Sequence, residues 1–182
     1  MTQKNYKSIK KYGNILFYIA LNRKEQEKIN YQLNLLKCII SSNSKITYFL
    51  SDKDVKLLYK EKVLATLKKP FDILIQNLIQ ILYDYNHFNY LLDIIDDYNQ
   101  RFDNLEKIIN VNVITAVLLS NEQKNKLQNI LIKKFNAKKV NINSIVNKDI
   151  MGGVIIKTKD IVIDGSISTR MLNLKNYLLS TI

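Results

Sequence analysis

Few residues of this 182-residue chain have the types and spacing that catalysis requires. Asp164-Gly165-Ser166 is the segment most easily mistaken for a nucleophile site, but the Gly-x-Ser-x-Gly pattern of a nucleophile elbow is missing around it. One histidine, His87, and one cysteine, Cys38, are too few for a typical zinc site. Glycine-rich phosphate-binding motifs are also missing. The sequence therefore predicts no catalytic residues, no metal site and no cofactor.

These reactive side chains have structural interpretations instead. His87 falls at a turn between two predicted helices, where an exposed or hydrogen-bonded histidine is usual. Cys38 lies beside an apolar stripe, and we expect its side chain to fill part of the core. Asp93, Asp96 and Asp97 are expected to form a solvated helix face. Because Asp96 and Asp97 are adjacent, they cannot point in the same direction from a helix.

The net charge of +12 bears on the partners of the chain. Residues 1–108 carry 17 basic and 12 acidic residues (+5), and residues 109–182 carry 11 and 4 (+7). Such a balance favours acidic partners, nucleic acid or an anionic membrane surface. The same lysines also accompany abundant Asn, Ile and Tyr, which is the composition expected from an AT-rich genome. Both explanations stay open at this point.

Hydrophobic periodicity of 3.6 residues dominates residues 1–108 and predicts a compact bundle of six helices. Ser51 with Asp54 resembles a capping box that would begin the fourth helix, and Pro70 is expected in the first turn of the fifth. The predicted helices cover residues 4–21, 24–40, 45–50, 51–68, from 70 onward, and 88–108.

The pattern changes near Ile109, so a small C-terminal α/β domain is predicted over residues 109–182. The domain is expected to begin with a strand from Ile109 and a helix opened by the Ser120–Gln123 capping box. A second strand over 140–146 and a hairpin over 151–163 are expected to follow. Asp164 or Ser166 is expected to cap a last helix. Four apolar residues of that helix are expected to face inward: Ile167, Met171, Leu174 and Leu178. The predicted fold class is α+β, mostly α.

Three of the four glycines lie in the last thirty or so residues. Gly152 and Gly153 indicate close backbone approach or a bulge at the start of the hairpin, and Gly165 permits a turn before the last helix. No apolar run approaches the ~20 residues needed to span a bilayer. The polar N-terminal residues lack the apolar region of a secretory signal, so none is expected.

Four segments resemble, in order and spacing, the delta subunit of F-type ATP synthases. Tyr12–Ala20 is similar to the family's Tyr-Ala-x-Ala-Leu-Phe-x-x-Ala helix, and Leu78–Tyr98 to its fifth and sixth helices. Val111–Gln123 resembles its strand and Leu-Ser-x-x-Gln helix start. The most specific match consists of residues from the hairpin and the last helix: Gly152, Gly153, Asp164, Gly165, Ser166 and Arg170.

The resemblance implies a non-catalytic stator subunit that links the catalytic head to the peripheral stalk and resists rotor torque. The helical domain would bind the N-terminal helix of an alpha subunit, and the C-terminal domain the b subunits. The association with the membrane would be peripheral, on the cytoplasmic face of a bacterial inner membrane or the equivalent matrix or stromal face.

For the alpha-subunit helix we expect a groove between the first and fifth helices. The residues expected to line it are Tyr12, Leu16, Ile19, Ile75, Leu78 and Leu82. The alternative for each of them is that it simply packs the bundle core.

The alternative function is a basic nucleic-acid-binding module. It would need basic residues grouped on one face together with stacking aromatics. The lysines are instead dispersed, and Phe135 and Tyr177 are the only aromatic residues after residue 108. We therefore expect no nucleic-acid partner.

Overall fold

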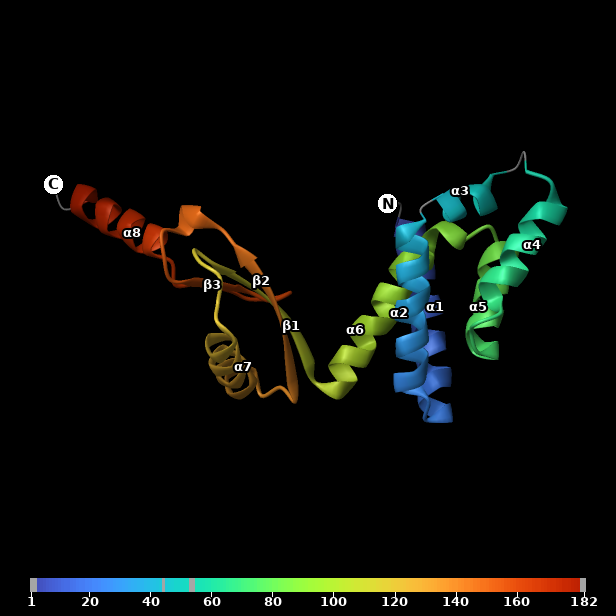
Figure 1. The fold of residues 1–182 in the computed structure, drawn as a ribbon, viewed down its shortest axis with the longest axis horizontal. Helices are drawn as coiled ribbons and strands as arrows, with labels where there is room; N and C mark the ends of the chain where they lie inside the picture. The colour runs from blue at the N-terminus through green and yellow to red at the C-terminus, as the bar shows by residue number, and fades with distance from the viewer. Residues whose placement is uncertain (1–2, 44, 53–54, 181–182) are drawn as a thin grey trace. The chain divides into compact units, whose positions relative to one another are not determined.

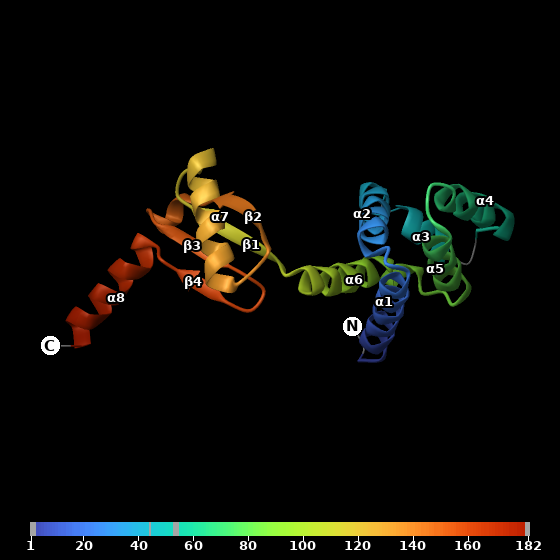
Figure 2. The same cartoon turned by 90° about the horizontal axis from the view of Figure 1, so that it is seen from below.

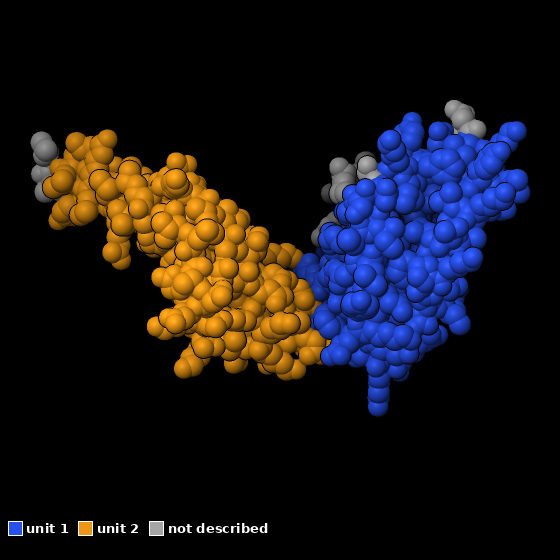
Figure 3. Space-filling view, in the orientation of Figure 1, with its two compact units in different colours: residues 1–102 blue, residues 103–182 orange. Residues whose placement is uncertain are grey.

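The computed structural model describes residues 3–43, 45–52 and 55–180, which form mainly helices (Figure 1). The chain divides into two compact units, Met1–Phe102 and Asp103–Ile182, coloured blue and orange in Figure 3. The described part of the first unit is helical, and the second combines helices with a small sheet. The predicted α+β class, with a helical bundle before a small α/β domain, is confirmed.

The first unit contains six α-helices and one 3₁₀ helix among its described residues, and the last α-helix runs on into the second unit. Their bounds are α1 Gln3–Arg23, α2 Gln26–Ser42, α3 Lys45–Ser51, α4 Leu57–Lys68, α5 Ile73–Asp84, the 3₁₀ helix η1 Phe88–Tyr90, and α6 Leu91–Glu106.

Apolar residues at helical spacing build the core of this unit. Ile29, Leu33, Leu36 and Ile40 repeat along one face of α2, and each is at most 2 % exposed. Helices α5 and α6 bury similar stripes, so the core draws on several helices at once. Each such side chain contributes roughly 1.5–3 kcal/mol by leaving water.

Polar contacts join α6 to its neighbours within the bundle. The Asn99 amide nitrogen donates to Asn34 at 2.9 Å, and Asn30 donates to Asn99 at 3.0 Å. The Tyr98 hydroxyl donates to the Gln26 carbonyl at 3.2 Å, and burial of this tyrosine raises its pKa well above the ordinary value. These bonds fix α6 against α2.

The acidic face of α6 is less solvated than the sequence suggests. The Asp97 side chain is 14 % exposed and accepts a hydrogen bond from Arg101 at 2.7 Å. Asp96 forms an ion pair with Lys37 of α2. The expectation of a solvated face therefore holds for Asp96, which is exposed, and is wrong for Asp97, because Arg101 lies four residues further along α6 and covers its carboxylate.

Two predicted helix starts and one core residue need correction. Helix α3 ends at Ser51 and α4 begins at Leu57, so Ser51 does not open that helix; Asp54 lies outside the described residues. Pro70 precedes α5, which begins only after Asp72 because the buried Phe71 donates its amide back to the Lys68 carbonyl at 3.0 Å. Cys38 is exposed, since its position points away from the buried stripe of α2.

The second unit contains a four-stranded sheet in the order β2-β1-β3-β4 (Figures 1 and 2). Strands β1 and β2 are parallel, and the pairs β1–β3 and β3–β4 are antiparallel. The bounds are β1 Ile108–Thr115, α7 Asn121–Phe135, β2 Lys139–Val146, the 3₁₀ helix η2 Lys148–Ile150, β3 Val154–Lys157, β4 Val162–Asp164 and α8 Ile167–Ser180.

Alternate residues of the strands form the two faces of this sheet. One face carries Val111, Val113, Val140 and Ile156 into a core with Leu131 of α7. On the other face, asparagines of β1 and β2 pair across the parallel register: Asn141 donates to Asn110 at 2.9 Å and Asn143 to Asn112 at 3.0 Å.

The predicted capping box before α7 is confirmed. Ser120 accepts from the Gln123 amide at 3.2 Å, while the Gln123 side chain accepts from the Ser120 amide at 2.9 Å. Two otherwise unpaired amides at the start of the helix are thereby satisfied.

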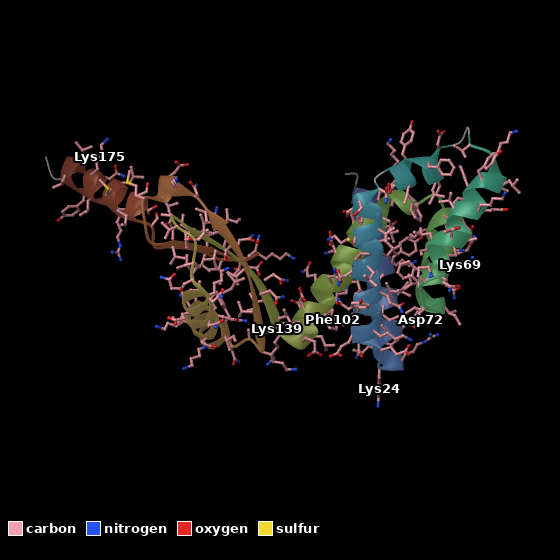
Figure 4. The ribbon with its side chains drawn as sticks, viewed as in Figure 1. Lys24, Lys69, Asp72, Phe102, Lys139 and Lys175 are labelled. Carbon is pink, nitrogen blue, oxygen red and sulfur yellow. The ribbon has the colours of Figure 1, made fainter. Side chains whose placement is uncertain are left out.

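The division between the units falls at Phe102, labelled in Figure 4, six residues before the boundary expected at 108. The last turn of α6 belongs with the sheet because Asn110 of β1 donates to Asp103 at 2.6 Å. Lys138, just before β2, forms an ion pair with Glu106 at 3.3 Å.

Helix α8 contradicts the inward orientation expected from its apolar stripe. Ile167, Met171, Leu174 and Leu178 are 46 %, 55 %, 64 % and 65 % exposed. The core face of the sheet is already covered by α7, and in both ribbon views α8 extends away from the sheet (Figures 1 and 2). The amphipathic pattern of α8 is real, but the described residues of this chain leave it uncovered.

Candidate functional site

The base of α8 is set by close packing of glycine backbone. Gly153 has φ +80°, a conformation that residues with a side chain rarely adopt, and a Cβ there would lie 2.3 Å from the Gly165 carbonyl oxygen. Two hydrogen bonds cross the same point: Gly165 donates to Val154 at 2.9 Å, and Ile167 donates to Gly152 at 3.0 Å. The glycines are therefore needed for the contact between the start of β3 and the start of α8.

Asp164 and Ser166 complete this junction as capping residues. Asp164 accepts from the Ser166 amide at 2.8 Å and from the Thr169 hydroxyl at 2.9 Å. Ser166, which is buried, accepts from the Thr169 amide at 3.2 Å. The hydrogen bonds from Ser166 have the largest effect on the Asp164 carboxyl, and with the bond from Thr169 they hold its pKa below the ordinary value. The segment thus positions the start of α8.

This junction positions an exposed apolar surface on α8, which we call the α8 stripe. It consists of Ile167, Met171, Leu174 and Leu178, which repeat at helical spacing, and Leu172, Tyr177 and Leu179 are exposed on other sides of the same helix. Arg170 and Lys175, the latter labelled in Figure 4, are exposed on the same helix. So large an apolar surface on one helix is typical of a site that binds another protein.

The six residues expected to line a groove between α1 and α5 fall into two groups. Leu16, Ile75, Leu78 and Leu82 are buried, whereas Tyr12 and Ile19 are half-buried. The buried four pack the core of the bundle.

Several exposed apolar residues of the same two helices were not singled out from the sequence. They are Ile15 and Tyr18 on α1 and Ile81 at the end of α5, with Tyr85 just after it. The available signal was their helical offset: Ile15 and Tyr18 are three residues apart, as are Tyr12 and Ile15.

His87 joins the two helices at this surface. Its Nδ1 lies 3.3 Å from the Tyr12 hydroxyl, and its ring lies against Tyr12 at 6.0 Å and Tyr85 at 6.4 Å between centroids. A tyrosine of α1 and one that follows α5 therefore meet through one half-buried imidazole. The position expected for His87, a turn with a hydrogen-bonding partner, agrees with this arrangement.

The described parts of the chain were compared with the requirements for a membrane-spanning helix and for a metal centre. None of the helices there is long and apolar enough to cross a membrane. No group of three or more histidine, cysteine or acidic residues is placed to hold a metal ion within those same ranges.

Comparisons with known proteins identify the family of this chain. Residues 9–178 match the family model of the ATP synthase delta (OSCP) subunit. The ATP synthase subunit delta of Ligilactobacillus salivarius is 35 % identical over 171 residues, covering 94 % of this chain and 95 % of that one. The protein of the same name from Lactiplantibacillus plantarum is 31 % identical over 180 residues and covers 99 % of both chains.

A solved structure shares the fold over nearly the full length. A chain in a cryo-EM structure of the Toxoplasma gondii mitochondrial ATP synthase hexamer superposes with a TM-score of 0.72 at 20 % identity, covering 98 % of each chain. The present chain belongs to the ATP synthase delta (OSCP) subunit family.

Membership settles the class of function. The chain is a non-catalytic structural subunit of an F-type ATP synthase, a stator component of the peripheral stalk. This confirms the resemblance inferred from the glycine segment and its neighbours. The nucleic-acid-binding alternative receives no support from any of the similar proteins.

Proposed function

We propose that the two units bind different parts of the synthase. The first would bind the N-terminal helix of an alpha subunit, and the second would bind the b subunits of the peripheral stalk. The observation that carries the proposal is the α8 stripe, because seven large apolar side chains are exposed on a helix that a glycine junction holds in place. A stator needs one such surface for each of the bodies it joins.

For the alpha subunit, the supporting surface is the exposed part of α1 and of α5 with the turn after it. Tyr12, Ile15 and Ile19 follow α1 at spacings of three and four residues, as required to meet a partner helix lying along it. Ile81 and Tyr85, four residues apart, provide the second side. The buried Leu78 and Leu82 support this surface from below.

For the b subunits, the α8 stripe supplies apolar area, and the basic excess of residues 109–182 supplies charge. Apolar burial would provide most of the affinity. Lysine and arginine at the rim would instead increase the association rate with acidic partners and make it sensitive to salt. The complex would lie at the cytoplasmic face of a bacterial inner membrane or at the equivalent matrix or stromal face.

The experiment tests each surface with the purified full-length chain. Two partners are used, an alpha N-terminal peptide and a soluble fragment from the C-terminal end of b, and their binding is measured by fluorescence anisotropy. We expect Leu174→Asp to weaken b binding at least about tenfold and to leave alpha binding within twofold, because an exposed charge on one helix opposes apolar docking there only. Tyr18→Asp serves as the matched control on α1, with the opposite result. Loss of both or neither interaction in Leu174→Asp would contradict the assignment.

A further inference from the structure

An apolar groove lies in the first unit, on helices that the proposed alpha and b sites do not use. It has a volume of about 420 Å³ and is lined by Ile39 of α2, Ile46 of α3 and Val63 of α4, together with Leu67 and Pro70. We call it the α4 groove. Its size falls within the ~300–1,000 Å³ that ligand pockets occupy. The lining is almost wholly apolar, so it favours an apolar occupant.

The charge around the α4 groove is basic. Lys62 lines it, Lys45 adjoins Ile46, and Lys69, labelled in Figure 4, adjoins Pro70. Among the described residues from 45 to 70, Asp52 and Glu61 are the acidic residues, against six lysines. Two of those lysines are already engaged, Lys60 with the Asp52 carbonyl and Lys68 with Gln80. An occupant with acidic residues beside an apolar stripe would match both properties.

A second copy of this chain does not fit that description. The chain carries a net charge of +12, so two copies would bring like charges together around the groove. On its α4 side the groove is lined by Val63 and by Thr66 and Leu67, three and four positions later, and this spacing suits a helix laid along α4.

We propose that the α4 groove binds an acidic amphipathic helix of a partner protein, as a third docking site separate from the alpha and b surfaces. The apolar stripe of that helix would occupy the space between Ile39, Ile46 and Val63, and its carboxylates would meet Lys62 and its neighbours. The proposal does not depend on the assignment of the other two sites.

The probe is a fluorescein-labelled 20-residue helical peptide with leucines on one face and glutamates on the other. Its controls are the same peptide with lysine in place of glutamate and a scrambled peptide that has no apolar face. Binding to the full-length chain is measured by anisotropy, and amide chemical shifts locate it. We expect saturable binding of the acidic peptide, at least about tenfold tighter than either control, with shifts at Ile39, Ile46 and Thr66.

Variants separate the groove from the rest of α4. Val63→Glu should weaken acidic-peptide binding at least about tenfold, while Leu58→Glu, an exposed apolar residue of the same helix outside the groove, should change it less than twofold. If Val63→Glu does not fold, Thr66→Trp fills the groove from an exposed position and takes its place.

Four outcomes would overturn the proposal. They are absence of binding, equal binding of the control peptides, shifts confined to the α8 stripe or α1, and equal losses in the Val63 and Leu58 variants. Self-association that the Val63 variant abolishes would instead assign the groove to a second copy. None of these results bears on the alpha and b sites, which Tyr18→Asp and Leu174→Asp test.

Discussion

Replacing Gly153 by alanine should loosen the junction that holds α8 against the hairpin. The added Cβ would lie 2.3 Å from the Gly165 carbonyl oxygen and 3.2 Å from the Ser166 Cα, so backbone rather than a flexible side chain must move. Alanine at φ +80° adds strain of about 1–2 kcal/mol. The hydrogen bonds from Gly165 to Val154 and from Ile167 to Gly152 contribute about 0.5–1.5 kcal/mol each.

Together these effects predict a loss of about 2–5 kcal/mol in the free energy of unfolding of the second unit, a large share of the ~5–15 kcal/mol typical of a native domain. Urea unfolding should be followed through the amide signals of Val111 and Val113, because these report the sheet of that unit alone. Native-state hydrogen exchange at the Gly165 and Ile167 amides should accelerate more than exchange in β1.

Gly152→Ala is the matched control. A Cβ at Gly152 would meet the Ile167 Cδ1 atom at 2.7 Å, but this is the end of an exposed side chain that can rotate away. We expect its effect on unfolding free energy to stay within about 1 kcal/mol, since the smaller entropy of the unfolded chain offsets part of the contact. Equal stability of the Gly152 and Gly153 variants would refute the argument from close backbone approach.

Two further predictions concern stability and pH. The hydrogen bonds that the Asp164 carboxylate accepts lower its pKa from 3.8. The stabilisation that this carboxylate gives α8 is therefore fully present above pH 3.8 and is lost as the pH falls through the lower pKa of the folded state. An NMR titration of the Ser166 amide should have its midpoint below 3.8, and a midpoint at or above 3.8 would contradict the cap. Leu78→Ala should reduce the unfolding free energy of the first unit by about 2–5 kcal/mol, whereas the exposed Ile81→Ala should change it by about 1 kcal/mol or less; similar losses by calorimetry would show that Leu78 is not a core residue.

Local signals in the sequence predicted much of the fold. The Ser120–Gln123 capping box and the periodic stripes of α2 and α6 predicted their helices because the responsible contacts lie within a few residues. Pro70 misled because it is compatible with a helix start but does not require one, and the buried Phe71 delays α5. The start of α4 at Leu57 carried no such marker, since Lys56 caps it without a side-chain hydrogen bond.

The site residues were harder to predict because periodicity identifies an apolar face without identifying what covers it. The stripe of Ile167, Met171 and Leu174 has the pattern of a core helix, yet α7 already covers the inner face of the sheet and leaves α8 exposed. In the bundle, the sequence left open whether Leu16 and Ile75 line a partner groove or pack the core, and both residues are buried. Only the three-dimensional arrangement separates the two cases.

The central claim is that the chain joins two bodies through separate surfaces. The most direct measurement is affinity purification of the tagged full-length chain from solubilised membranes of its own cells, with the wild type compared with a Met171→Asp, Leu174→Asp double variant. We predict that the wild type recovers alpha and b subunits in fixed proportion, and that the folded variant recovers alpha but loses b. Recovery of b by the folded variant at the level of the wild type would contradict the account.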